Sequence, residues 1–143
     1  MKLLLIVTAV LEAAAGLALL VMPSTAVSIL LGVPLETPAG LVAGRIAGTA
    51  LIALAVACWQ TKDSEPGGTS TGVVEAMLFY NFAATVVLAY AGIRLELRSG
   101  LLWPTIVLHF GLGAWCLLSL WFTSRKSSKV RTTITHPDEP QTL

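Results

Sequence analysis

The sequence predicts an all-α integral membrane protein, a bundle of four transmembrane helices with a short interfacial connector between helices 1 and 2. The composition is the first observation behind this prediction. Of the 143 residues, 55% are hydrophobic and only 12% are charged, whereas a soluble domain carries about 25% charged residues. The second is a set of four apolar windows, each long enough to cross a hydrocarbon core of ~30 Å at about 1.5 Å per helical residue. A single four-helix transmembrane domain over residues 1–122 therefore accounts for most of the chain.

The four spans are expected at about residues 3–22, 39–59, 73–93 and 101–122. Between the first two, the stretch PSTAVSILLGVPLETP is bounded by Pro23 and Pro38, and prolines interrupt membrane helices at their edges. Within it, Ser24 or Thr25 would cap a short helix that ends at Gly32 and lies on the membrane surface. The second connector, QTKDSEPGGTSTG, is polar and glycine-rich, which predicts an aqueous loop.

Residues 123–143 lack apolar periodicity and are expected to form a flexible cytoplasmic tail. An even number of spans places both termini on one side, and lysine and arginine are enriched on the cytoplasmic side. Arg94 and Arg98 are the basic residues on one side. On the side of the termini, the basic residues are Lys2, Lys62, Arg125, Lys126, Lys129 and Arg131. Both termini are therefore expected in the cytoplasm.

Each span carries a polar side chain with a hydroxyl four residues away, and residues four apart share a helix face. The pairs are Thr8 with Glu12, Arg45 with Thr49, Asn81 with Thr85, and Thr105 with His109. Counting along each helix places Glu12, Arg45, Asn81 and His109 near the middle of the membrane, roughly 12 to 20 Å from the cytoplasmic edge.

An ionised side chain that faces lipid at this depth costs at least ~2.5 to 3.5 kcal/mol. We therefore expect Glu12 and Arg45 to point inward and form a buried ion pair. Asn81 and His109 would supply the additional hydrogen bonds that a buried pair needs.

The second span also contains Gly40, Gly44 and Gly48, a pattern of small residues every fourth position that lets another helix approach closely. Such a pattern serves either packing within the bundle or a dimer interface. We expect packing within the bundle.

The sequence offers no enzymatic motif. Cys58 and Cys116 lie in different spans without CxxC spacing, so no zinc site or redox pair is indicated. His109 is the only histidine in a span, which leaves no pair of histidines for haem, and neither a phosphate loop nor a nucleophile motif occurs. We predict no catalytic residue, no metal site and no cofactor.

A bound lipid or quinone remains compatible with the sequence, because apolar grooves with a few polar anchors suit amphiphiles. The net charge of +1 and the scattered basic residues argue against nucleic acid as a partner.

The order GLALLVMP, LLGVPLETPAGLVAGRIAGTALIAL, MLFYNFAA and LWPTIVLHFGLGAW resembles small, mostly uncharacterised bacterial four-helix membrane proteins of the DoxX-like kind. The resemblance covers about residues 10–120. It implies a four-helix bundle in the bacterial cytoplasmic (inner) membrane. It also implies an accessory role, since some DoxX-type proteins are membrane subunits of quinone-linked redox systems. It assigns no catalytic residue.

The chain is also similar in one respect to the small multidrug resistance transporters, which have four spans and one glutamate in the first. Glu12 in LEAAAG has the corresponding placement. The arginine and histidine within spans, the long second connector and the long tail depart from that family.

Three interpretations of the polar residues follow from the sequence. In the first, the polar residues only determine which helix packs against which. In the second, they belong to an accessory or assembly subunit, or to a module that binds a lipophile. In the third, they serve a small proton-coupled transporter that uses Glu12. We expect the second, with membrane lipids and either a homo-oligomer or a larger membrane complex as partners. A transporter needs a carboxyl group that binds and releases protons, and a neighbouring arginine would disfavour its protonation.

Overall fold

The structure, a computed structural model, describes residues 1–65 and 68–135, and side chains as far as Arg125. Within these ranges the chain is helical and contains no strand. The helices are α1 (Lys2–Val21), α2 (Pro23–Leu31), α3 (Pro38–Thr61), α4 (Thr69–Arg94) and α5 (Leu102–Thr135). By length and composition, α1, α3, α4 and the Leu102–Arg125 part of α5 are suited to cross a membrane. The predicted all-α class and the four apolar helices are thus confirmed over the described residues.

The connector between the first two long helices contains the predicted short helix, α2. It begins at Pro23, with Met22 as the N-cap residue and no side-chain cap, so neither Ser24 nor Thr25 caps it. Proline is favourable at the first helical position, because a backbone N–H at that position has no acceptor within the helix. The absence of this N–H in proline therefore costs no hydrogen bond. The helix ends where predicted, at Gly32, whose φ of 83° lies in the left-handed region.

Gly32 also brings α2 against the connector between α4 and α5. A Cβ atom added at Gly32 would lie 2.5 Å from the carbonyl oxygen of Arg98. Nearby, the Ser99 hydroxyl donates a hydrogen bond to the carbonyl oxygen of Ile29. α2 is therefore fixed at its C-terminal end to the second half of the chain.

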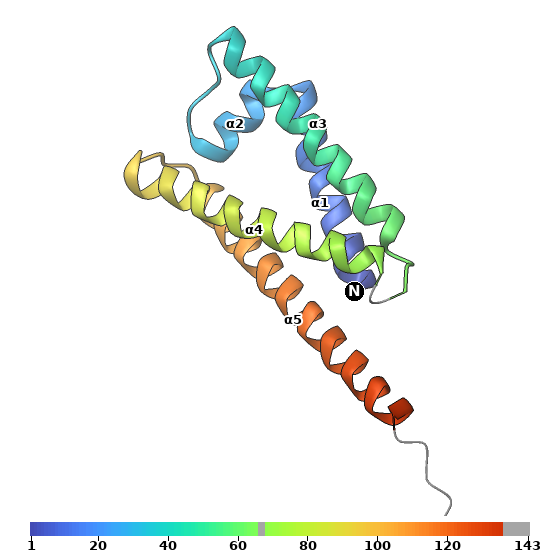
Figure 1. The fold of residues 1–143 in the computed structure, drawn as a ribbon. Coiled ribbons are helices and arrows are strands. Elements are labelled where there is room, and N and C mark those ends of the chain that lie inside the picture. Colours follow the sequence, from blue (N-terminus) through green and yellow to red (C-terminus); the bar gives the residue numbers. More distant parts are fainter. Residues whose placement is uncertain (66–67, 136–143) are drawn as a thin grey trace, which may run out of the picture.

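The four long helices form two antiparallel pairs, α1 with α3 and α4 with α5, which diverge from each other in Figure 1. Glycines set the first pair: a Cβ atom at Gly16 would lie 2.7 Å from the carbonyl oxygen of Gly48, and one at Gly48 would lie 2.6 Å from that of Gly16. Gly44 lies against Pro23 and Leu35. The small-residue pattern of the second span therefore packs within the chain, as expected.

The two pairs meet at the end that carries the N-terminus, where all four long helices contribute to one apolar core. Its buried residues are Leu4, Leu5, Ala9, Cys58, Val74, Met77, Leu112 and Cys116. At the opposite end, α2 reaches across to the connector between α4 and α5. Contact at both ends leaves space between the pairs at mid-length.

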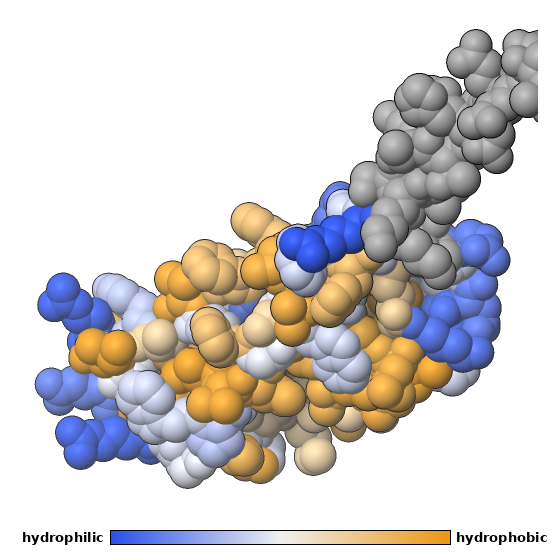
Figure 2. Space-filling model, turned by 90° about the horizontal axis from the view of Figure 1, so that it is seen from below, coloured by the Kyte–Doolittle hydropathy of each residue, from blue (hydrophilic) through white to orange (hydrophobic). Residues whose placement is uncertain are grey.

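Charged groups occupy the ends of the molecule. Lys2 and Lys62 form ion pairs with Asp63 at 2.7 and 2.9 Å, and hydrogen bonds from the two ammonium groups lower the pKa of Asp63 to about 2. The face in Figure 2 is largely apolar over the middle of the molecule and hydrophilic at both ends. This distribution is the one expected for a chain whose central part is surrounded by hydrocarbon.

The first part of the expected cytoplasmic tail is helical in the structure. α5 continues beyond Phe122 to Thr135, because the stretch TSRKSSKVRTTIT contains neither glycine nor proline and the next proline is Pro137. The prediction for the remaining residues, 136–143, lies outside the described part of the chain.

Candidate functional site

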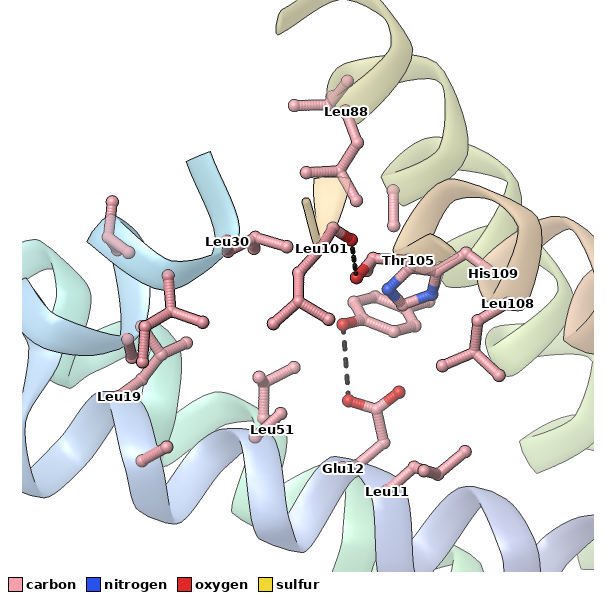
Figure 3. A pocket seen from close by; sticks show the side chains of 18 of the residues that line it. Leu11, Glu12, Leu19, Leu30, Leu51, Leu88, Leu101, Thr105, Leu108 and His109 are labelled. Carbon is pink, nitrogen blue, oxygen red and sulfur yellow. Dashed lines mark hydrogen bonds between the residues drawn. The ribbon is translucent and has the colours of Figure 1, made fainter. Parts of the chain in front are cut away.

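A cavity of about 560 Å³ lies between the two helix pairs and is lined by all five helices. Binding pockets for small molecules usually measure roughly 300 to 1,000 Å³. Its walls are mainly leucine, alanine, valine and isoleucine side chains, among them Leu19, Leu51 and Leu88 in Figure 3. The polar side chains that reach it are Glu12, Tyr80, Thr105 and His109. The cavity is thus an apolar chamber with a small polar region.

Glu12 reaches the cavity from α1 and is 3% exposed. The Tyr80 hydroxyl of α4 donates a hydrogen bond to one carboxylate oxygen of Glu12 at 3.3 Å, the contact drawn across the space between the helix pairs in Figure 3. The other carboxylate oxygen has no hydrogen-bond partner among the described residues. Glu12 and Tyr80 are thus a polar link between the two pairs.

His109 of α5 forms a hydrogen bond with Asn81 of α4. Asn81 is fully buried, its amide nitrogen donates to the carbonyl oxygen of Met77 at 2.8 Å, and its amide oxygen lies 2.9 Å from Nδ1 of His109. The rings of Tyr80 and His109 meet edge to face, with centroids 5.7 Å apart. The side chains therefore form one continuous row, Glu12, Tyr80, His109 and Asn81, which we call the polar row.

Of the four polar residues singled out in the sequence, the structure brings Glu12, Asn81 and His109 into this row. Tyr80, which completes it, was not predicted, because the hydroxyls considered were those four residues from each polar side chain and Tyr80 directly precedes Asn81. A usable signal was present, since Tyr80 precedes Asn81 in MLFYNFAA and carries a hydroxyl in the middle of an apolar helix. A buried tyrosine usually finds a hydrogen-bond partner.

Arg45 lies outside the row, and the predicted Glu12–Arg45 ion pair does not form. Arg45 is exposed, and among the described residues no ion pair joins it to Glu12. The register of α1 against α3 gives the reason: Gly48 faces Gly16, and Gly44 faces Pro23. Arg45 is therefore level with the end of α1, two to three helical turns, or roughly 12 to 16 Å, from Glu12.

Arg45 is the eighth residue of α3, which begins at Pro38, so it lies about 10 Å from the N-terminal end of that helix. A long arginine stem can carry the guanidinium from such a position towards the membrane surface. A buried acidic partner is then unnecessary.

The threonines expected to support the polar cluster bind backbone instead. The hydroxyls of Thr49, Thr85 and Thr105 donate to carbonyl oxygens four residues earlier in the chain, a local bond that such residues form readily in helices. Thr8 is buried, and its hydroxyl has no partner among the described residues. The hydroxyls therefore do not extend the polar row.

Within the described ranges, no three histidine, cysteine or acidic side chains come together in a way that could hold a metal ion. Cys58 and Cys116 are both buried and free. The polar row can accept hydrogen bonds from a molecule in the cavity.

No protein-family model matches the chain, and no curated protein or solved structure matches it either. The geometry of the site is therefore the basis for assigning a function.

Proposed function

We propose that this chain is an integral membrane protein that binds an amphiphilic lipophile, of the size of a lipid chain or a quinone, in the cavity between its helix pairs. The observation that carries the proposal is the combination of apolar walls with one polar row, in a cavity lined by all five helices. The apolar body of an amphiphile would lie against the leucine and alanine side chains, and its polar end would bond to the row.

The proposed location is the bacterial inner membrane, with both termini in the cytoplasm. Four helices of suitable length and composition support insertion. Lys2 and Lys62 meet at one end of the molecule, and Thr123 lies against Met1 there, which brings Arg125 to the same end. Arg94 and Arg98 lie at the other end, on the connector side of α4. Lys126, Lys129 and Arg131 follow Arg125 in the sequence, so the larger basic group belongs to the end with the N-terminus even when Arg45 is counted at the other end. Basic residues of membrane proteins are enriched on the cytoplasmic side.

A role as an accessory subunit in a quinone-linked complex is proposed on the DoxX-like resemblance alone. It is compatible with lipophile binding, because a subunit that holds a lipophile could serve such a complex.

Filling the cavity tests the binding function. Ala15 lines the cavity, so Ala15→Phe would place an aromatic ring inside it. Ala14 is exposed and lies about 200° around the helix from Glu12, so Ala14→Phe adds the same ring on the opposite face. Purification in a mild detergent followed by extraction and mass spectrometry should find a lipophile with the parent chain and the Ala14→Phe variant, and a strongly reduced amount with Ala15→Phe. Equal recovery from all three proteins would contradict the proposal.

Proton-coupled transport is the second candidate, and one observation favours it. The sequence-based objection was that an arginine would neutralise Glu12, and Arg45 does not. A carboxyl group in an apolar chamber without a cationic partner is suited to exchange a proton for a ligand. In liposomes, a proton gradient that drives the bound lipophile across the membrane in the parent chain, and fails to do so in Glu12→Gln, would separate transport from binding alone.

A further inference from the structure

The hydrogen-bonding atoms of the polar row determine what kind of polar group they can receive. Asn81 has its amide nitrogen bonded to the carbonyl oxygen of Met77, so its amide oxygen faces His109. An amide oxygen only accepts, which means that Nδ1 of His109 donates the hydrogen. In a neutral imidazole the other nitrogen, Nε2, is then an acceptor. No described residue bonds to Nε2.

The remaining polar atoms at the cavity are also left as acceptors. The Tyr80 hydroxyl donates its hydrogen to Glu12, and the Thr105 hydroxyl donates its hydrogen to the carbonyl oxygen of Leu101. The second carboxylate oxygen of Glu12 has no partner among the described residues. A polar group that enters the cavity would thus find acceptors at Glu12 and His109, which favours a group that donates hydrogen bonds.

Charge narrows the choice among donors. Glu12 is the only acidic or basic residue among those that line the cavity, leaving His109 aside. A carboxylate in hydrocarbon must be compensated by a proton or a cation. A hydroxyl would satisfy the free oxygen but leave the charge uncompensated. An amine that takes the proton of the carboxyl group supplies both the donors and the compensating charge. The Tyr80 ring beside the carboxylate would favour the same cation.

The geometry points to a lipophilic amine, bound as its ammonium ion, as the ligand of this cavity. The nitrogen donates to the free oxygen of Glu12 and to Nε2 of His109, and the hydrocarbon part lies among the leucines of α1, α2 and α4. This inference rests on the proposed function and adds the chemical class of the ligand.

Three probes with one chain length test the class on the purified full chain in nanodiscs: dodecylamine, dodecanol and dodecyltrimethylammonium. A primary alkylamine is protonated at neutral pH, as the lysine side chain is. For each probe, binding to the cavity is defined as the binding that is lost in Ala15→Phe and kept in Ala14→Phe. Dodecylamine should bind at least about tenfold more tightly than dodecanol, because bonds to a charged group are stronger than neutral ones. The quaternary ion should fall between them, since it has charge but no N–H donor.

Glu12→Gln keeps the shape of the side chain and should reduce the affinity for dodecylamine to that for dodecanol. Glu75→Gln is the matched control, because Glu75 is exposed and does not line the cavity; it should leave all three affinities unchanged. Equal binding of amine and alcohol, unaffected by Glu12→Gln, would refute the ligand class and leave the proposed function standing. Equal binding of the primary and quaternary ions would refute the hydrogen-bond donor requirement. Two negative results together would refute both the proposed function and this inference: no probe binds in a way that Ala15→Phe abolishes, and no natural lipophile copurifies with the protein.

Discussion

At the residue scale, the central feature is a carboxyl group separated from the basic residue expected to pair with it. The sequence shows that Glu12 and Arg45 each lie well inside an apolar helix, and the cost of exposing a charge to lipid makes a pair between them reasonable. The distance along each helix, however, does not fix how two helices slide against each other. Contact between Gly16 and Gly48 sets that register and leaves Glu12 beside Tyr80 instead.

A double-mutant cycle measures whether the two charges interact. We expect the effects of Glu12→Gln and Arg45→Gln on the free energy of unfolding to add within about 0.5 kcal/mol, because residues this far apart without shared partners are energetically independent. Denaturant titration of the two single variants and the double variant gives the coupling. A coupling energy above about 1 kcal/mol would show that the charges meet in the native protein.

At the scale of elements, the decisive contact is the close approach of α1 and α3. The atoms that a Cβ at Gly16 or Gly48 would meet are carbonyl oxygens of the facing helix, 2.7 and 2.6 Å away. Backbone atoms within a helix cannot rotate aside as a side chain can, so any added methyl group must push the two helices apart. The pattern of small residues was visible in the sequence, whereas its partner on the first helix became definite only in the folded chain.

Gly48→Ala should therefore lower the free energy of unfolding by about 1 to 3 kcal/mol, the usual cost of overpacking. Gly111→Ala is the matched control in another long helix, because nothing lies within 4 Å of the Cβ it would add. It should be neutral or stabilise the protein by up to ~1 kcal/mol through helix propensity. Thermal unfolding in detergent measures both, and similar values for the two variants would contradict the tight α1–α3 contact.

At the scale of the whole molecule, two helix pairs meet at both ends and diverge between them. The shared core at the N-terminal end and α2 at the other end hold the pairs together, so the cavity is a consequence of topology. In the proposed membrane orientation, the connector after α3 faces the cytoplasm and the connector after α4 faces the outside.

Cysteine labelling tests this orientation. Cys58 and Cys116 are buried, so the parent chain should react little. Ser64 is exposed in the connector after α3, and Gly100 is exposed in the connector after α4 with nothing within 4 Å of an added Cβ. A membrane-impermeant maleimide added to spheroplasts should label Gly100→Cys and spare Ser64→Cys until the membrane is opened. The reverse pattern would invert the proposed orientation, and labelling of both from outside would contradict the single crossing by α4 between them.

The sequence by itself determined the helical class, the four long apolar helices, the short helix that ends at Gly32 and the placement of polar side chains inside apolar segments. These follow from local properties: hydrophobicity, the fixed rise of a helix, and the backbone limits of proline and glycine. The tertiary structure alone decided the partner of Glu12, the exposure of Arg45, the role of Tyr80 and the existence of a cavity. Each of these depends on the register and divergence of helices that are distant in the chain, which are set by side-chain contacts between helices and not by any property of one helix.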